Sequence, residues 1–258
     1  MPEYCKVEKD GRILTVTLNR PERLNALHPP ANSELGELFD EFADDPELWV
    51  AIITGEGRGF CAGNDLKFQA EGKMRGVEVP TRGFGGLTAR YDCDKPVIAA
   101  VNGVAMGGGF EIALACDLII ASEDAKFALP EPRVGLAALA GGIHRLPRQI
   151  GMKHAMGMML TGRRVAAQEG HELGFVNEVV PAAELMATAR HWAEQICECA
   201  PLSVRASKQA AMQGMAYGTI EAAMDAPYDA IREMIKSDDF IEGPRAFAEK
   251  RKPAWKGR

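Results

Sequence analysis

The chain has 258 residues, of which 47% are hydrophobic and 26% are charged, and its formal net charge is −6. This length suits one α/β unit with an appendage, and the composition is that of an ordinary soluble globular protein. Lysine and arginine are scattered singly or in short runs, so the sequence lacks the broad basic surface typical of nucleic-acid binding. We therefore expect no nucleic-acid partner.

The cysteines and the N-terminus indicate a cellular compartment. The six cysteines show no repeated C-x-x-C spacing, and the first residues contain no apolar signal segment. No stretch approaches the roughly 20 apolar residues that a membrane span needs. We expect a protein of the reducing cytoplasm without membrane association.

The first half of the chain alternates strand and helix signals. The β-branched residues 12–18 predict a strand, the apolar spacing over residues 29–43 predicts a helix, and residues 49–54 predict another strand. This order is typical of an α/β crossover. Residues 55–90 are rich in glycine and charge, which predicts a long surface loop broken by short helical pieces, of a length usually explained by function.

The middle of the chain contains a strand, a glycine run and a helix. Residues 96–101 predict a buried strand, and Gly107-Gly108-Gly109 leads into an apolar helix at residues 110–116. This arrangement is an anion-binding geometry. Two short strands are expected next, at residues 117–121 and 126–129, before the stiff segment Pro130-Glu131-Pro132.

The remaining sequence is predicted to be mainly helical. Helices are expected at residues 144–150, 153–160, 166–173, 182–199, 202–215, 220–236 and 237–250, with a strand at residues 175–180. We expect residues 1–195 to form a catalytic core and residues 196–258 a C-terminal helical oligomerisation region.

The glycine run is the sharpest candidate for chemistry. Three successive glycines permit close backbone approach, and the next helical turn presents unpaired amides, so a developing negative oxygen would be stabilised there. The alternative is a tight packing turn between strand and helix.

Two glutamates are candidate acid–base groups. Glu111 lies in an otherwise apolar turn and either caps its helix or faces a functional cavity, whereas Glu131 alone resembles an ordinary loop carboxylate. Brought to one pocket, two carboxylates can divide acid and base roles because proximity and desolvation separate their proton affinities.

The segment 59–66 predicts a second part of the site. The amide of Ala62 is expected to join that of Gly108 in an oxyanion hole. Cys61 is interpreted as a packing residue, because no His or Asp pattern supports a nucleophile. The dinucleotide-like run that starts at Gly55 has Phe60 in place of the expected glycine, and no zinc-ligand spacing occurs, so neither NAD nor metal binding is predicted.

The sequence resembles the crotonase (enoyl-CoA hydratase/isomerase) family along nearly its whole length. The motifs that carry the resemblance are Leu18-Asn19-Arg20-Pro21, Asn25-Ala26-Leu27, Cys61-Ala62-Gly63-Asn64-Asp65-Leu66, Asn102-Gly103, Gly107-Gly108-Gly109, Glu111 and Cys116-Asp117. The resemblance implies an α/β fold, a crotonase-like spiral of repeated strand-strand-helix units with a C-terminal helical trimerisation region. It also implies self-association as a homotrimer or hexamer.

The resemblance further implies an acyl-CoA substrate, with its thioester oxygen on the amides of Ala62 and Gly108. The other residues that it places at the substrate or at CoA are Arg23, Leu24, Ala26, Asp65 and Leu66, together with Phe247 and Lys250, which would reach the CoA of a neighbouring subunit. In the hydratase pattern Glu111 helps to deprotonate the water and Glu131 delivers the proton to the α-carbon. No metal or redox cofactor is implied, and coenzyme A is part of the substrate.

The activity that the resemblance implies is addition or removal of water across the α,β double bond of an acyl-CoA thioester, with crotonobetainyl-CoA and carnitinyl-CoA as candidate substrates. The segment 136–140 departs from typical hydratases, which carry a proline and smaller or polar residues there, and Ala138 and Leu139 bear on the acyl specificity. This departure leaves open double-bond isomerisation or thioester hydrolysis, and a noncatalytic CoA-binding or scaffolding protein is the alternative of another class.

Overall fold

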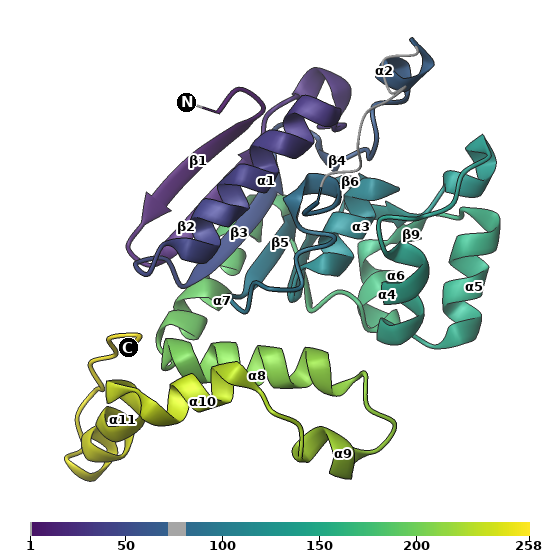
Figure 1. The fold of residues 1–258 in the computed structure, drawn as a ribbon. Coiled ribbons are helices and arrows are strands. Elements are labelled where there is room, and N and C mark those ends of the chain that lie inside the picture. The colour runs from purple at the N-terminus through teal and green to yellow at the C-terminus, as the bar shows by residue number, and fades with distance from the viewer. Residues whose placement is uncertain (1, 72–80) are drawn as a thin grey trace.

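The computed structural model describes residues 2–71 and 81–258, and two sheets organise the core (Figure 1). The larger sheet has the order β1-β2-β3-β5-β7-β10, parallel from β2 onward, with β1 antiparallel at one edge. Its strands are β1 (Cys5–Asp10), β2 (Ile13–Leu18), β3 (Val50–Gly55), β5 (Val97–Val101), β7 (Leu118–Ser122) and β10 (Glu178–Val180). The central strands β3 and β5 are buried throughout, as expected for parallel strands covered on both faces.

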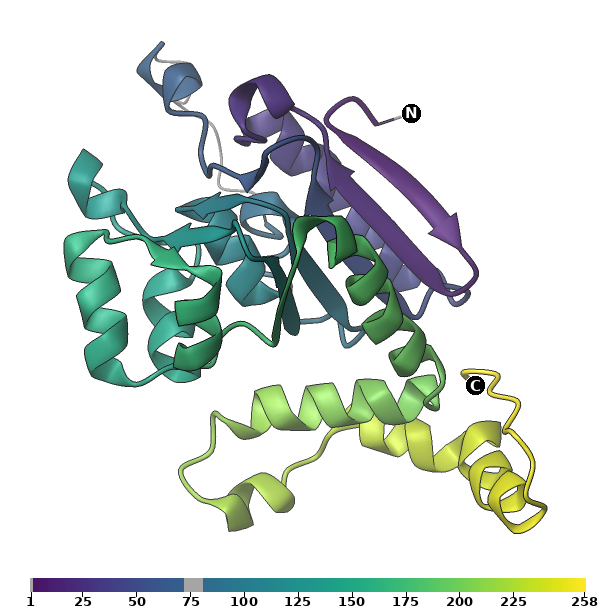
Figure 2. The same ribbon diagram turned by 180° about the vertical axis from the view of Figure 1, so that it is seen from behind.

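Two helices cover the opposite faces of this sheet, as the two views show (Figures 1 and 2). α1 (Pro29–Asp44) packs Leu35, Phe39 and Phe42 against one set of alternating strand residues. α7 (Leu185–Cys197) packs Leu185, Ala189 and Ala193 against the other set. Because side chains alternate between the faces of a strand, each central strand contributes to both cores.

The smaller sheet has the order β4-β6-β8-β9 and lies beside the larger one. Its strands are β4 (Gly59–Cys61), β6 (Val104–Met106), β8 (Lys126–Ala128) and β9 (Val165–Ala166). Each of the first three directly follows a strand of the larger sheet, and α2 (Leu66–Ala70) and α3 (Gly108–Ala115) follow β4 and β6. The predicted strand-strand-helix repeat is therefore confirmed, and the repeat places the starts of α2 and α3 at the end of the same small sheet.

Short helices lie in the segments that link the strands and the longer helices. The 3-10 helices are η1 (Pro21–Arg23), η2 (Phe84–Gly86), η3 (Glu131–Val134) and η4 (Ala182–Glu184), and the α-helices are α4 (Gly142–Gln149), α5 (Met152–Thr161) and α6 (Ala167–Leu173). The predicted loop 55–90 thus contains β4, α2 and η2, and its residues 72–80 lie outside the described part of the chain.

The C-terminal region is a separate helical layer below the core (Figure 1). It comprises α8 (Pro201–Gly214), α9 (Ile220–Met224), α10 (Asp229–Lys236) and α11 (Asp238–Ala248). The single helix predicted over residues 220–236 is wrong, because the chain breaks at Asp225-Ala226-Pro227, where proline cannot continue the backbone hydrogen bonds. The predicted division at residue 195 falls near the end of α7 and stays a prediction.

Candidate active site

The start of α3 presents free backbone amides beside the small sheet. Gly107 has a positive φ of 54°, and its N–H donates to the carbonyl of Ala128 at 2.9 Å. As the first helical residue, Gly108 has an amide without an intrahelical acceptor, and no acceptor occurs elsewhere among residues 2–71 and 81–258. Gly109 packs so tightly on the Cys61 carbonyl that any side chain there would overlap it. The glycine run therefore brings a free amide against β4.

The segment after β4 supplies a second free amide, and it belongs to Asn64. The N–H of Ala62, which the sequence predicted as the second donor, instead donates to the carbonyl of Leu24 at 2.9 Å. Gly63 accepts from Leu27 and Asp65 donates to Leu27, which leaves the Asn64 amide between them without an acceptor in the described chain. A Cβ on Gly63 would lie 3.1 Å from the Gly108 nitrogen, so this segment and α3 are in close contact.

Glu111 lies one helical turn after Gly108 and is almost fully buried, with 3% of its surface exposed. Its Oε1 accepts the N–H of Gly142, the first residue of α4, at 2.8 Å. Burial raises the pKa of Glu111 to about 7, while amide hydrogen bonds from Gly142 and Ala140 lower it and the charge of Glu131 raises it. This carboxyl therefore exchanges its proton near neutral pH.

Glu131 begins η3 and also lies against the glycine run. Its Oε1 would be 3.0 Å from a Cβ on Gly107, and its Oε2 is buried without a hydrogen-bond partner in the described structure. Burial raises its pKa above the ordinary glutamate value. An unsatisfied buried carboxylate oxygen suits a ligand that carries hydrogen-bond donors. The structure thus brings the two predicted glutamates to the same glycine run.

The remaining predicted residues are placed less directly. Ala26 is buried, Arg23 and Leu66 are exposed, and Asp65 is buried in an ion pair with Arg20 at 3.1 Å while it also caps α2. Leu24 is partly buried at a positive φ of 49°. Together these residues flank the Asn64 segment.

Phe247 and Lys250 lie elsewhere. Both are exposed at the end of α11, in the C-terminal layer, and Figure 1 shows this helix far from α3. The single chain therefore does not bring them to the two glutamates.

Sequence reasoning missed an aromatic residue at the site. Phe84 on η2 packs its ring against the Cα of Gly108, so that a Cβ there would lie 2.5 Å from the ring. Gly83 and Gly85 on either side of it have positive φ values of 73° and 62°, which suit glycine. The glycines in residues 83–86 are the only sequence signal that pointed to this loop.

Cys61 is a packing residue, as the sequence indicated. It is fully buried, its Sγ donates to the carbonyl of Asn25 at 3.2 Å, and burial raises its pKa to about 12. A thiol that stays protonated is a poor nucleophile.

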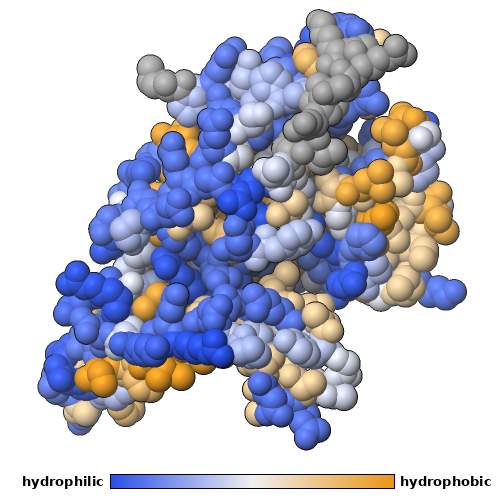
Figure 3. All heavy atoms as spheres, in the orientation of Figure 1, coloured by the Kyte–Doolittle hydropathy of each residue, from blue (hydrophilic) through white to orange (hydrophobic). Residues whose placement is uncertain are grey.

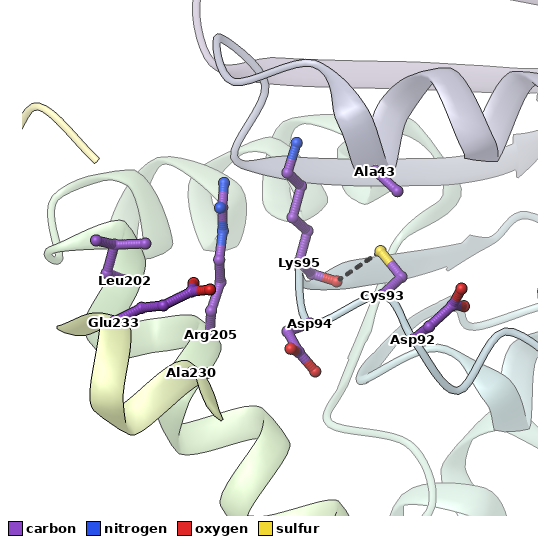
Figure 4. Close-up of a pocket in the computed structure, with 9 residues that line it drawn as sticks. All are labelled: Ala43, Asp92, Cys93, Asp94, Lys95, Leu202, Arg205, Ala230 and Glu233. Atoms are coloured by element: carbon purple, nitrogen blue, oxygen red, sulfur yellow. Dashed lines mark hydrogen bonds between the residues drawn. The ribbon is translucent and has the colours of Figure 1, made fainter. Parts of the chain in front are cut away.

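A cavity of about 140 Å³ lies between the core and the C-terminal layer (Figure 4). Neither Glu111 nor Glu131 lines it. Lys95 donates to the carbonyls of Phe42 and Asp45 beside this cavity, and Lys208 donates to Asp117 and to the Lys95 carbonyl. The Lys208 contacts join the C-terminal layer to the core beside this cavity. The cavity is therefore not part of the candidate active site.

Comparisons with known proteins assign the chain to a family. Residues 8–258 match the family described as Enoyl-CoA hydratase/isomerase. The chain belongs to the enoyl-CoA hydratase/isomerase family. It is 47% identical to a carnitinyl-CoA dehydratase of Proteus mirabilis and 45% identical to that of Salmonella typhi, over the full length of each.

Solved structures of enoyl-CoA hydratase/isomerase family members have the same fold. An enoyl-CoA hydratase from Mycobacterium tuberculosis H37Rv superposes with a TM-score of 0.92 at 40% identity, covering 99% of both chains. A probable enoyl-CoA hydratase/isomerase from Mycobacterium abscessus superposes with a TM-score of 0.91 at 38% identity, covering both chains completely. The predicted family and fold are therefore confirmed.

The raised pKa of Glu111 gives a prediction about stability. A buried carboxyl whose pKa is about 7, against 4.5 when unfolded, stabilises the fold when protonated and loses this contribution as the pH rises through 7. Glu111→Gln removes the charge but keeps an oxygen for the Gly142 amide. We expect its advantage in free energy of unfolding over the wild type to widen by about 2 kcal/mol between pH 5 and pH 8.

Urea denaturation at the two pH values measures this difference. Glu172→Gln on α6 is the matched control, because it makes the same substitution at an exposed glutamate. A constant gap between Glu111→Gln and wild type would mean that Glu111 is ionised in the fold throughout this range.

Proposed function

We propose that this chain is an acyl-CoA hydratase or dehydratase that adds or removes water across the α,β double bond of a thioester. The observation that carries the proposal is the placement of both Glu111 and Glu131 at a glycine run whose Gly108 amide is free. The enoyl-CoA hydratase and carnitinyl-CoA dehydratase names of similar proteins support the same reaction.

The reaction makes two demands that these groups fit. Attack of water at the β-carbon develops negative charge on the thioester oxygen, and the amides of Gly108 and Asn64 would stabilise that oxygen. Water must also lose a proton and the α-carbon must gain one, which we assign to Glu111 and Glu131, respectively. In the reverse direction the same groups remove water.

The pair works with one shared proton. If both carboxyls were ionised no acid would remain, and if both were protonated no base would remain, so the singly protonated pair is the active form. Burial raises the pKa of both carboxyls, and that of Glu111 to about 7, so the pair keeps its one proton up to about neutral pH and kcat/KM falls above it. We propose that no metal or redox cofactor takes part, because thioester activation and the carboxyls supply the chemistry.

Binding of CoA is proposed for the segment that flanks Asn64 and for the C-terminal region. The residues concerned are Arg23, Leu24, Ala26, Asp65 and Leu66, with Phe247 and Lys250 acting toward a neighbouring subunit. Phe247 is 88% exposed, and the exposed apolar residues of α10 and α11 form an orange patch in Figure 3, which supports self-association as a trimer or hexamer. In the described chain no helix is long and apolar enough to cross a membrane. A cytoplasmic location remains our proposal.

The acyl group is proposed to be that of crotonobetainyl-CoA or carnitinyl-CoA, on the strength of the 45–47% identical relatives. The purified protein is incubated with crotonyl-CoA, crotonobetainyl-CoA and longer enoyl-CoAs, and products are followed by mass. We expect a gain of one water, fastest with crotonobetainyl-CoA. An unchanged mass with a shifted double bond would indicate isomerisation, release of free CoA would indicate hydrolysis, and no reaction would favour a binding protein.

A further inference from the structure

Arg145 on α4 contacts two separate segments of the candidate active site. Its Nη2 donates to the carbonyl of Thr88 at 2.8 Å, and its Nη1 lies 3.4 Å from the carbonyl of Ala140. The ring of Tyr91 lies 5.9 Å from its guanidinium carbon. The planar guanidinium suits this bridging role, because it directs several donors at fixed angles.

The first of these segments, which contains Thr88, positions the ring of Phe84 at the site. The N–H of Phe84 donates to Thr88 Oγ1 at 2.7 Å, and the carbonyl of Phe84 accepts the N–H of Thr88 at 3.3 Å. Phe84 in turn contacts Gly108, whose amide is free. A displacement of Thr88 would therefore move the ring that packs against Gly108.

The second segment, residues 140–142, contacts the carboxyl group of Glu111. Ala140 and Gly141 directly precede Gly142, whose N–H donates to Glu111 Oε1. Gly141 has a positive φ of 105°, and a side chain there would overlap the Arg145 guanidinium. The backbone N–H of Arg145 also donates to the carbonyl of Gly141 at 2.8 Å, so residue 145 fixes this turn through both main chain and side chain.

Charge adds an effect that packing alone would not give. In the described structure, the charged groups that act on Glu111 are Glu131, which raises its pKa, and Arg145, which lowers it.

We propose that Arg145 is a positioning residue that joins the Phe84 loop to the Glu111 turn, so that the oxyanion amide and the carboxyl pair keep one geometry. This role rests on the proposed hydratase function. A residue whose contacts are purely structural would affect stability only, whereas a positioning residue also changes the rate and the pH profile.

The experiment compares Arg145→Met, Arg145→Lys and Arg148→Met. Arg148 is the matched control, because it lies on the same helix, is exposed, and donates within α4 to the carbonyl of His144. The readouts are kcat and KM for hydration of crotonyl-CoA from pH 5 to pH 9, together with urea denaturation over the same range.

Arg145→Met is expected to lose about 10²-fold in kcat, the effect of a displacement of about 1 Å at reacting groups. Without the positive charge Glu111 holds its proton to higher pH, so the alkaline limb should move up by about one unit. Arg145→Lys keeps the positive charge and loses the planar guanidinium. Its kcat should therefore fall, while the alkaline limb of its pH–rate profile stays in place. It also serves as the second test should the Met variant fail to fold.

Stability separates this proposal from the proposed function. The pH window over which Arg145→Met loses stability should move upward relative to wild type, and the shift should vanish when Glu111→Gln is added, whether or not the protein hydrates crotonyl-CoA. A protein without hydratase activity that still shows this shift would overturn the proposed function alone. If both Arg145 variants match Arg148→Met in rate, alkaline limb and stability window, Arg145 is not a positioning residue.

Discussion

Glu111→Gln and Glu131→Gln are each expected to reduce kcat for hydration by about 10²- to 10⁴-fold, the range for loss of a positioned acid or base. Glutamine preserves the shape of each side chain, and at position 111 it still offers an oxygen to the Gly142 amide. The loss should therefore reflect proton transfer. Burial raises the pKa of both carboxyls, and that of Glu111 to about 7, so each variant removes a group that can exchange a proton at the glycine run.

The double variant provides a sharper test. Two groups that share one proton act as a unit, so losing both should cost little more than the larger single loss. Steady-state kinetics of the three variants, beside Glu172→Gln as the surface control, measures this. A double loss equal to the product of the two single losses would show that the glutamates act independently, and either single variant at wild-type rate would remove that residue from the mechanism.

Much of the core could be predicted because its signals are local. The apolar spacing of α1 and the buried β-branched runs of β3 and β5 depend only on neighbouring residues, and the structure confirms them. β1 was missed because it is an edge strand with a sequence rich in lysine and glutamate. β4 was missed because it has three residues and exists through pairing with β6, which is distant in sequence.

The candidate site was predictable to the same degree. The glycine run and Glu111 are adjacent in sequence, and the stiff prolines around Glu131 marked its loop. The choice between the amides of Ala62 and Asn64 was not predictable, because it depends on which N–H pairs with Leu24 across the fold. Nor could any local pattern show that Arg145 reaches Thr88, since 57 residues separate them.

Gly63→Ala tests the second amide, and we expect it to reduce kcat by about 10²- to 10³-fold, the cost of losing one oxyanion donor. Gly63 has a φ of 91°, and a methyl group there would lie 2.6 Å from the Met106 carbonyl and 3.1 Å from the Gly108 nitrogen. The added atom must push the Asn64 amide and the Gly108 amide apart. Donors that act on the developing charge should affect kcat and kcat/KM about equally.

The control for Gly63→Ala is Gly174→Ala, which follows α6. Gly174 has a similar φ of 98° and no atom within 4 Å of a new Cβ, so it carries the backbone cost of alanine at positive φ without the contact. Both variants should lose about 1 kcal/mol or more of stability from the backbone, measured by urea denaturation. Only Gly63→Ala should also have a reduced kcat. Equal kcat values in the two variants would mean that the Asn64 and Gly108 amides do not act together on the thioester oxygen.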